Sequence, residues 1–205
     1  MKNLNTRSAF AAALILCLAR HVGAQNAPAS LPANNAQETF AFPKGTFTYA
    51  LYGAQGAQYI GTNGNKTRED MTQLTTGVAY YFMPDVSFGW EITGSYTTQP
   101  GPNHYIGAGG GNLQMLAHFL DERTWTLFGD CELGMLESNH QIPPNGTDFN
   151  FTVHLGVGAT AHLWDNVNLI SGVRYLHLSN ADVHGPVRNP SINGGEAYIG
   201  LLFKL

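Results

Sequence analysis

Three polar residues that could do chemistry stand together in the stretch VRYLHLSNADVHGP, which runs from Val173 to Pro186. They are His177, Ser179 and Asn180. A serine hydroxyl becomes an effective nucleophile when a neighbouring imidazole takes its proton, and an asparagine amide can donate a hydrogen bond to a developing oxyanion. The alternative is that these are ordinary interfacial and turn residues where a strand runs into a loop. The elements that position them decide between the two.

The first 24 residues have the order of a secretory signal peptide. Lys2 and Arg7 precede the apolar run SAFAAALILCLA, and small residues follow it up to Ala24, where we expect cleavage. The run is well short of the ~20 residues that a membrane-spanning helix needs. Residues 25–43 are rich in Pro, Ala and Asn, and we expect them to form a flexible N-terminal segment.

Composition narrows the class of protein further. The net charge is -4, so the chain has no basic surface for nucleic acid, which we exclude as a partner. After the signal peptide, Cys131 is the one remaining cysteine, and no intramolecular disulfide is expected. Glycine and aromatic residues are abundant, whereas charged residues make up only 12% of the chain. These features suit one exported domain.

Alternation of apolar and polar residues predicts a barrel over residues 44–205. We expect eight strands, at about residues 45–60, 72–82, 86–97, 105–119, 124–137, 149–163, 167–179 and 195–205. Tight breaks alternate with longer polar ones along the chain. This is the rhythm of an up-and-down antiparallel barrel with turns at one end and loops at the other.

The faces of these strands indicate what surrounds the barrel. From Phe149 to Leu163 the odd positions are all apolar, while the even ones are polar or glycine. A soluble barrel would turn the apolar face inward and a membrane barrel would turn it outward. The signal peptide, the aromatic residues near strand ends and the final strand EAYIGLLFKL favour the membrane. We therefore predict an all-β, eight-stranded antiparallel up-and-down transmembrane β-barrel, a monomer in the bacterial outer membrane.

Several ionisable residues fall on the polar face of the predicted strands. Eight strands enclose only enough room for side chains, so we expect these residues to form a packed, hydrogen-bonded interior rather than a channel or a metal site. They are Glu91, His118, Asp130, Glu132 and Arg174.

The strand at residues 167–179 carries two of the three chemically interesting residues. Its odd positions form the lipid-facing set, and His177 and Ser179 continue that face toward the loop end. Residues two apart on a strand lie ~7 Å apart along it, and side chains that lean together can close this distance. Because ionisable groups at membrane depth are usually functional, this placement favours chemistry.

The stretch RYLHLSNAD, the loop after it and a final strand that carries a glutamate resemble the lipid A 3-O-deacylases and the looser set of acyloxyacyl hydrolase-like proteins around them. The resemblance implies an outer-membrane serine esterase that removes the ester-linked 3-O 3-hydroxyacyl chain from lipid A of lipopolysaccharide. It implies His177 as base, Ser179 as nucleophile, Asn180 in the oxyanion hole and Glu196 as the residue that orients the histidine. No metal or organic cofactor is required.

Glu196 departs from this pattern in one respect. The apolar face of the last predicted strand is odd, so regular alternation sends Glu196 to the interior, away from His177. Either a bulge at Gly194 and Gly195 turns the carboxylate outward, or another group orients the imidazole. We favour the outward arrangement, because adjacent glycines relax the backbone there.

Two other functions remain open at this point. A non-enzymatic small barrel would act in surface interaction or membrane integrity through its loops. An outer-membrane phospholipase would share the nucleophile and differ in its substrate.

Overall fold

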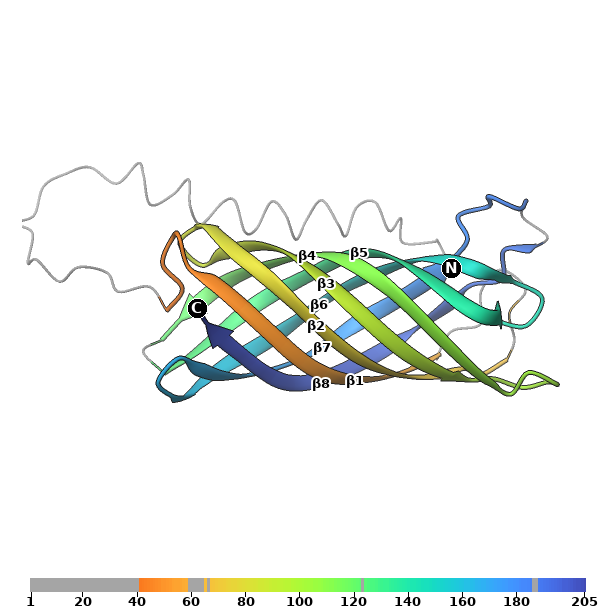
Figure 1. Cartoon of the computed structure of the whole chain (residues 1–205), viewed down its shortest axis with the longest axis horizontal. Helices are drawn as coiled ribbons and strands as arrows, with labels where there is room; N and C mark the ends of the chain where they lie inside the picture. Colours follow the sequence, from red (N-terminus) through yellow and green to blue (C-terminus); the bar gives the residue numbers. More distant parts are fainter. Residues whose placement is uncertain (1–40, 59–64, 66, 123, 186–187) are drawn as a thin grey trace, which may run out of the picture.

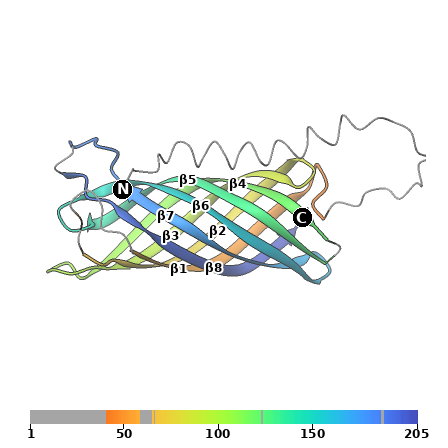
Figure 2. The same cartoon turned by 180° about the vertical axis from the view of Figure 1, so that it is seen from behind.

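The protein is a closed antiparallel barrel in which β1 pairs with β8 (Figures 1 and 2). The computed structural model describes residues 41–58, 65, 67–122, 124–185 and 188–205; the predicted signal peptide and most of the predicted segment 25–43 lie outside them. The strands are β1 (Phe47–Gln58), β2 (Asp70–Met83), β3 (Val86–Thr98), β4 (Tyr105–Asp121), β5 (Trp125–Ile142), β6 (Thr147–Trp164), β7 (Val167–Ser179) and β8 (Ile192–Lys204). The predicted eight-stranded fold is confirmed.

The two faces of the sheet follow the alternation in the sequence. Apolar side chains stand on the outer surface, where Trp90 is 52% and Val173 60% exposed. Polar and charged side chains point inward, and Glu91 and His154 are each 2% exposed. The apolar face is therefore turned outward, as predicted for a membrane barrel. An outer surface of this kind suits lipid and not water.

The two ends of the barrel differ. The turn end carries the connections β2–β3, β4–β5 and β6–β7 and the C-terminus, and it lies on the left in Figure 1. Its tight turns place Asp85 and Asp165 at positive φ, a conformation that aspartate tolerates. The loop end carries the other four connections, including the segment 180–191 that leads from β7 to β8. None of the described residues belongs to a helix long and apolar enough to cross a membrane.

An interior charge cluster fills the middle of the barrel. It consists of Glu91, Asp130, Glu132, His154, Arg174 and Glu196, each of which is buried. Arg174 lies at its centre, where it pairs with Glu132 and donates from Nε to Glu196 Oε1 at 2.5 Å. The expected packed interior is confirmed for Glu91, Asp130, Glu132 and Arg174. His118 is also buried, nearer the turn end, and contacts Tyr81 and Thr126.

The start of β8 differs from the prediction and matters most for function. The strand begins at Ile192, not at residue 195, and pairs with β1 and β7 without a register shift. A Cβ added at Gly194 would lie 1.9 Å from the carbonyl oxygen of Ala57, so glycine here permits the close approach of β1 and β8. The glycine therefore serves strand packing, and Asn193 lies within a regular strand.

Candidate active site

His177 and Ser179 form a hydrogen-bonded dyad near the loop end of β7. The distance from His177 Nε2 to Ser179 Oγ is 3.0 Å. The two side chains lie on the outward face of the strand and lean together, which closes the ~7 Å that separates alternate residues. The distance lies within the range that a general base needs to take the proton of its nucleophile.

Asn193 on β8 orients the imidazole. It lies opposite His177 in the β7–β8 register, and its Oδ1 is 2.8 Å from His177 Nδ1. The Asn193 amide is itself held, because its Nδ2 donates to Ser191 Oγ at 2.8 Å and the Tyr175 hydroxyl donates to its Oδ1. An amide oxygen only accepts hydrogen bonds, so Nδ1 carries the proton and Nε2 is left to accept from Ser179.

Glu196 does not take part in this arrangement, and the expectation of an outward carboxylate is wrong. Glu196 is 3% exposed and points into the barrel, where it accepts from Arg174 and, at 2.8 Å, from Gln73 Nε2. The reason is the regular strand: with no bulge beside Gly194, parity sends position 196 to the interior. Asn193 lies where the orienting group is needed.

Asn180 follows the dyad and fixes the loop behind it. Its Nδ2 donates to the carbonyl of Arg188 at 2.6 Å and to Thr147 Oγ1 at 3.2 Å. Its backbone N–H donates to Asn189 Oδ1 at 3.0 Å. The structure brings Asn180 next to Ser179, and the donors of Asn180 hold the segment that follows β7.

Two adjacent residues of this loop have an unusual backbone. Ala181 and Asp182 follow Asn180 at φ angles of 52° and 63°. Asp182 N donates to Asn180 Oδ1 at 3.1 Å, which ties the turn to Asn180. Aspartate tolerates this conformation, whereas alanine is strained in it, and strained residues of this kind concentrate near functional sites. Ser179 therefore stands at the edge of a constrained turn.

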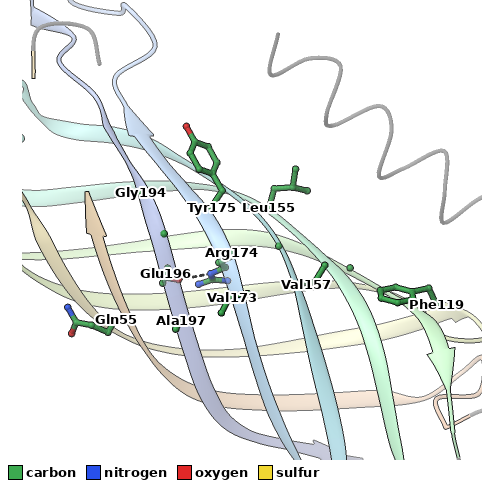
Figure 3. A pocket seen from close by; sticks show the side chains of 13 residues that line it. Gln55, Phe119, Leu155, Val157, Val173, Arg174, Tyr175, Gly194, Glu196 and Ala197 are labelled. Carbon is green, nitrogen blue, oxygen red and sulfur yellow. Dashed lines mark hydrogen bonds and ion pairs between the residues drawn. The ribbon is translucent and has the colours of Figure 1, made fainter. Parts of the chain in front are cut away.

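A mainly apolar groove of about 810 Å³ lies on the outer surface of the barrel (Figure 3). Tyr175, two residues before His177, borders it, together with Leu155, Val157 and Val173. Its other lining residues include Phe119, Gly129, Gly195 and Ala197. Because small residues on β5 and β8 alternate with larger ones on β6 and β7, the outer surface is hollowed on the same side as the dyad.

The sequence analysis missed Asn193 and Tyr175 as parts of the site. Their only signal was parity, since both are odd-numbered positions on strands whose odd positions face outward. Within the described part of the chain, no group of three His, Cys, Asp or Glu side chains is placed to hold a metal ion. The arrangement thus brings together a serine hydroxyl, an imidazole that can accept its proton and a neutral amide oxygen that accepts from the imidazole.

A comparison with known protein families identifies the family to which the barrel belongs. The model of the family described as lipid A 3-O-deacylase (PagL) matches residues 37–201, which span β1 to β7 and most of β8 and include both strands of the site. The chain belongs to the lipid A 3-O-deacylase family. The resemblance inferred from the HLSN stretch is therefore confirmed. Lipid A 3-O-deacylases are hydrolases, and membership places the barrel in the bacterial outer membrane.

Two solved structures, Neisserial surface protein A and OprG, share the fold of this lipid A 3-O-deacylase family member. Neisserial surface protein A is 18% identical, with a TM-score of 0.54, over 78% of this chain and 97% of that chain. The outer membrane protein OprG from Pseudomonas aeruginosa is 13% identical, with a TM-score of 0.50, over 80% of this chain and 97% of that chain. The crystal structure of the outer membrane enzyme PagL is 18% identical, with a TM-score of 0.44, over 78% of this chain and 98% of that chain. No curated protein matches the chain.

Proposed function

We propose that this chain is a serine esterase that removes the ester-linked 3-O 3-hydroxyacyl chain from lipid A of lipopolysaccharide. One observation carries the proposal: the 3.0 Å contact between His177 Nε2 and Ser179 Oγ, on the outward face of the barrel near its loop end. A substrate embedded in the outer leaflet presents its esters at the depth of this face. Membership of the lipid A 3-O-deacylase family supports the choice of substrate.

The reaction proceeds through an acyl-enzyme. Ser179 Oγ attacks the ester carbonyl carbon while its proton passes to His177 Nε2. The tetrahedral oxyanion collapses, the bond to the sugar oxygen breaks, and His177 returns the proton to that oxygen. A water molecule, deprotonated by His177, then hydrolyses the serine ester and releases the 3-hydroxy fatty acid.

Asn193 takes the orienting role in this proposal. It holds His177 in the tautomer that accepts the serine proton, as a carboxylate does in a Ser-His-Asp triad and an asparagine does in Cys-His-Asn sites. A neutral amide stabilises the imidazolium less than a carboxylate would. The expected consequence is a correctly oriented but weaker base.

Asn180 is the proposed donor to the oxyanion. Its position directly after Ser179 supports this role, and a side-chain amide there can meet the charge that develops on the ester oxygen. The role requires one Nδ2 hydrogen to leave the Arg188 carbonyl or Thr147 Oγ1 when the substrate binds. Asn180 would thus stabilise the loop in the free enzyme and the oxyanion in the transition state.

The apolar groove beside Tyr175 gives the acyl chain a place to lie. It is large enough for a lipid-sized ligand and shares the outward face of β7 with the dyad. Its lining is mainly apolar, with Gln55, Arg174 and Glu196 also bordering it, so it suits a hydrocarbon chain.

The test compares purified protein in detergent micelles with Ser179→Ala and His177→Ala variants. Release of 3-hydroxy fatty acid from lipid A is measured by mass spectrometry. We expect each variant to lose about 1000-fold or more of the wild-type rate while it keeps the gel shift of a folded barrel on unheated samples. Ser171→Ala, on the same face of β7 but without an imidazole neighbour, is the matched control and should retain activity.

Two outcomes would overturn the proposal. Release of fatty acid from phospholipid but not from lipid A would make the protein a phospholipase. A folded wild type that releases nothing from either lipid would favour a barrel that acts without catalysis.

A further inference from the structure

A polar cluster at the loop end joins the end of β1 to the residues before β2. Glu69, which immediately precedes β2, is only 1% exposed. Its Oε2 accepts from Asn65 Nδ2 at 3.1 Å and its Oε1 accepts from the Thr67 hydroxyl. Asn65 Nδ2 also donates to Gln58 Oε1 at 3.0 Å. A carboxyl group buried this deeply at the end of a strand is uncommon unless it is paired.

The same asparagine reaches across to the segment before β8. Asn65 Nδ2 lies 3.3 Å from the carbonyl oxygen of Ser191, which is itself 1% exposed. The hydroxyl of that serine accepts the hydrogen bond that fixes the Asn193 amide, and Asn193 in turn orients His177. A continuous set of contacts therefore links Glu69, in the connection between β1 and β2, with the base on β7.

Ser191 joins the two halves of this set of contacts. It stands directly before β8, which begins at Ile192, and it forms an isolated β-bridge. Asn193 must keep its Oδ1 toward His177, because a rotated amide would offer Nδ2 hydrogens to a nitrogen that already carries one. Holding Ser191 from the β1–β2 side prevents this rotation.

The carboxyl group of Glu69 keeps Asn65 in place. Two donors, Asn65 Nδ2 and Thr67 Oγ1, converge on its two oxygens, and Thr67 Oγ1 and N also lie 2.6 and 3.1 Å from Asn65 Oδ1. Burial raises the pKa of the Glu69 carboxyl above its ordinary value, while the bonds from Thr67 and Asn65 oppose the shift. The hydrogen bonds from Thr67 and Asn65 offset part of the free-energy cost of burying this carboxyl group.

We propose that Glu69 is a positioning residue of the hydrolytic site, which acts through Asn65 and Ser191 to fix the Asn193 amide and hence the His177 imidazole. The inference rests on the proposed serine esterase function. Glu69 touches neither the substrate nor the reacting atoms. Its effect should appear in the turnover number and should depend on the presence of Asn193.

The experiment is a double-mutant cycle on the full mature protein in detergent micelles, with lipid A as substrate. Glu69→Ala, Asn193→Ala and the double variant are compared with wild type by kcat and KM. We expect Glu69→Ala to lower kcat about 10-fold and to leave KM nearly unchanged, as is typical when a supporting residue behind a catalytic group is removed. In the Asn193→Ala background the same change should have almost no effect, because the two residues act in series.

Two further variants keep the test decisive. Asp70→Asn removes the neighbouring carboxylate, which forms an exposed ion pair with Arg68, and should retain wild-type kcat. Glu69→Gln preserves the shape of the side chain but replaces one accepting oxygen with a donor, so it should lower kcat as well. Glu69→Gln decides the matter if Glu69→Ala does not reach the folded state.

The outcomes separate this inference from the proposed function. An active wild type with unchanged kcat in both Glu69 variants would overturn the positioning role alone. So would an equal loss of kcat with and without Asn193, since Glu69 would then act by another route. A folded but inactive wild type would overturn the proposed function and this inference with it.

Discussion

Two cross-strand pairs on β7 and β8 have opposite roles. His177 faces Asn193 on the outward surface. Arg174, three residues earlier on β7, faces Glu196, three residues later on β8, in the interior. The outward pair is a hydrogen bond from the imidazole to an amide at 2.8 Å. The inward pair is a buried ion pair between Nε and Oε1 at 2.5 Å. One register produces both.

The difference between the pairs comes from parity. Positions an odd number of residues apart on a strand point to opposite faces, so the step from 177 to 174 turns the side chain from lipid to interior. The interior pair belongs to a cluster in which Arg174 offsets the charge of several carboxylates. The outward pair has one polar neighbour for each imidazole nitrogen. Ion pairs therefore stabilise the interior of the barrel, whereas hydrogen bonds between neutral groups hold the His177 side chain on the outward face.

Removal of the interior cation should have the largest effect on stability. Arg174→Met leaves Glu132 and Glu196 buried without their partner, and we expect it to lower the free energy of unfolding by about 3–5 kcal/mol. The measurement is urea unfolding of the refolded barrel, followed by tryptophan fluorescence. Arg68→Met, which breaks only an exposed pair with Asp70, is the matched control. Equal midpoints for the two variants would contradict the structural role of Arg174.

Changes at Asn193 should act on turnover and pH dependence. Asn193→Ala should lower kcat about 100-fold, because the imidazole loses its orienting acceptor. Asn193→Asp should retain activity, and its carboxylate should stabilise the imidazolium, so the acidic limb of the pH–rate profile moves to higher pH. The profile of kcat against pH for the wild type and both variants checks this. An unmoved acidic limb in the active Asn193→Asp variant would argue against contact with His177.

The smallest effect is expected at Glu196. Glu196→Gln keeps the size of the side chain and its capacity to accept from Arg174, so kcat should stay within about twofold of wild type. Steady-state release of fatty acid measures this directly. A loss of kcat as large as that of Asn193→Ala would mean that Glu196 contributes to catalysis, and it would contradict the comparison between the two pairs.

Much of the fold could be predicted because period-two alternation is a local property of the chain. The eight strands follow from it. The apolar outer face and the buried positions of Glu91 and Glu132 follow from it together with the signal peptide and the aromatic residues near strand ends, which favour a membrane barrel. The dyad could also be predicted, since His177 and Ser179 lie on one strand. Their contact depends on spacing within a single element.

The third member of the site could not be predicted in the same way. Its identity depends on which residue of β8 lies opposite His177, and register between strands is set by pairing along the whole barrel. The glycines at positions 194 and 195 suggested a break or a bulge, whereas Gly194 is needed for the approach of β8 to β1. The sequence accordingly predicts a loop up to residue 194, which includes Asn193, and predicts Glu196 as the residue that orients His177.

The most direct test of the hydrolytic centre is covalent labelling with a long-chain alkyl fluorophosphonate, which reacts with activated serine hydroxyls. The folded protein in micelles is treated, digested and mapped by mass spectrometry. We predict an adduct on Ser179 in the wild type, its absence in Ser179→Ala and a strongly reduced rate of labelling in His177→Ala. A folded wild type without the adduct, or a His177→Ala variant labelled as fast as wild type, would contradict the account.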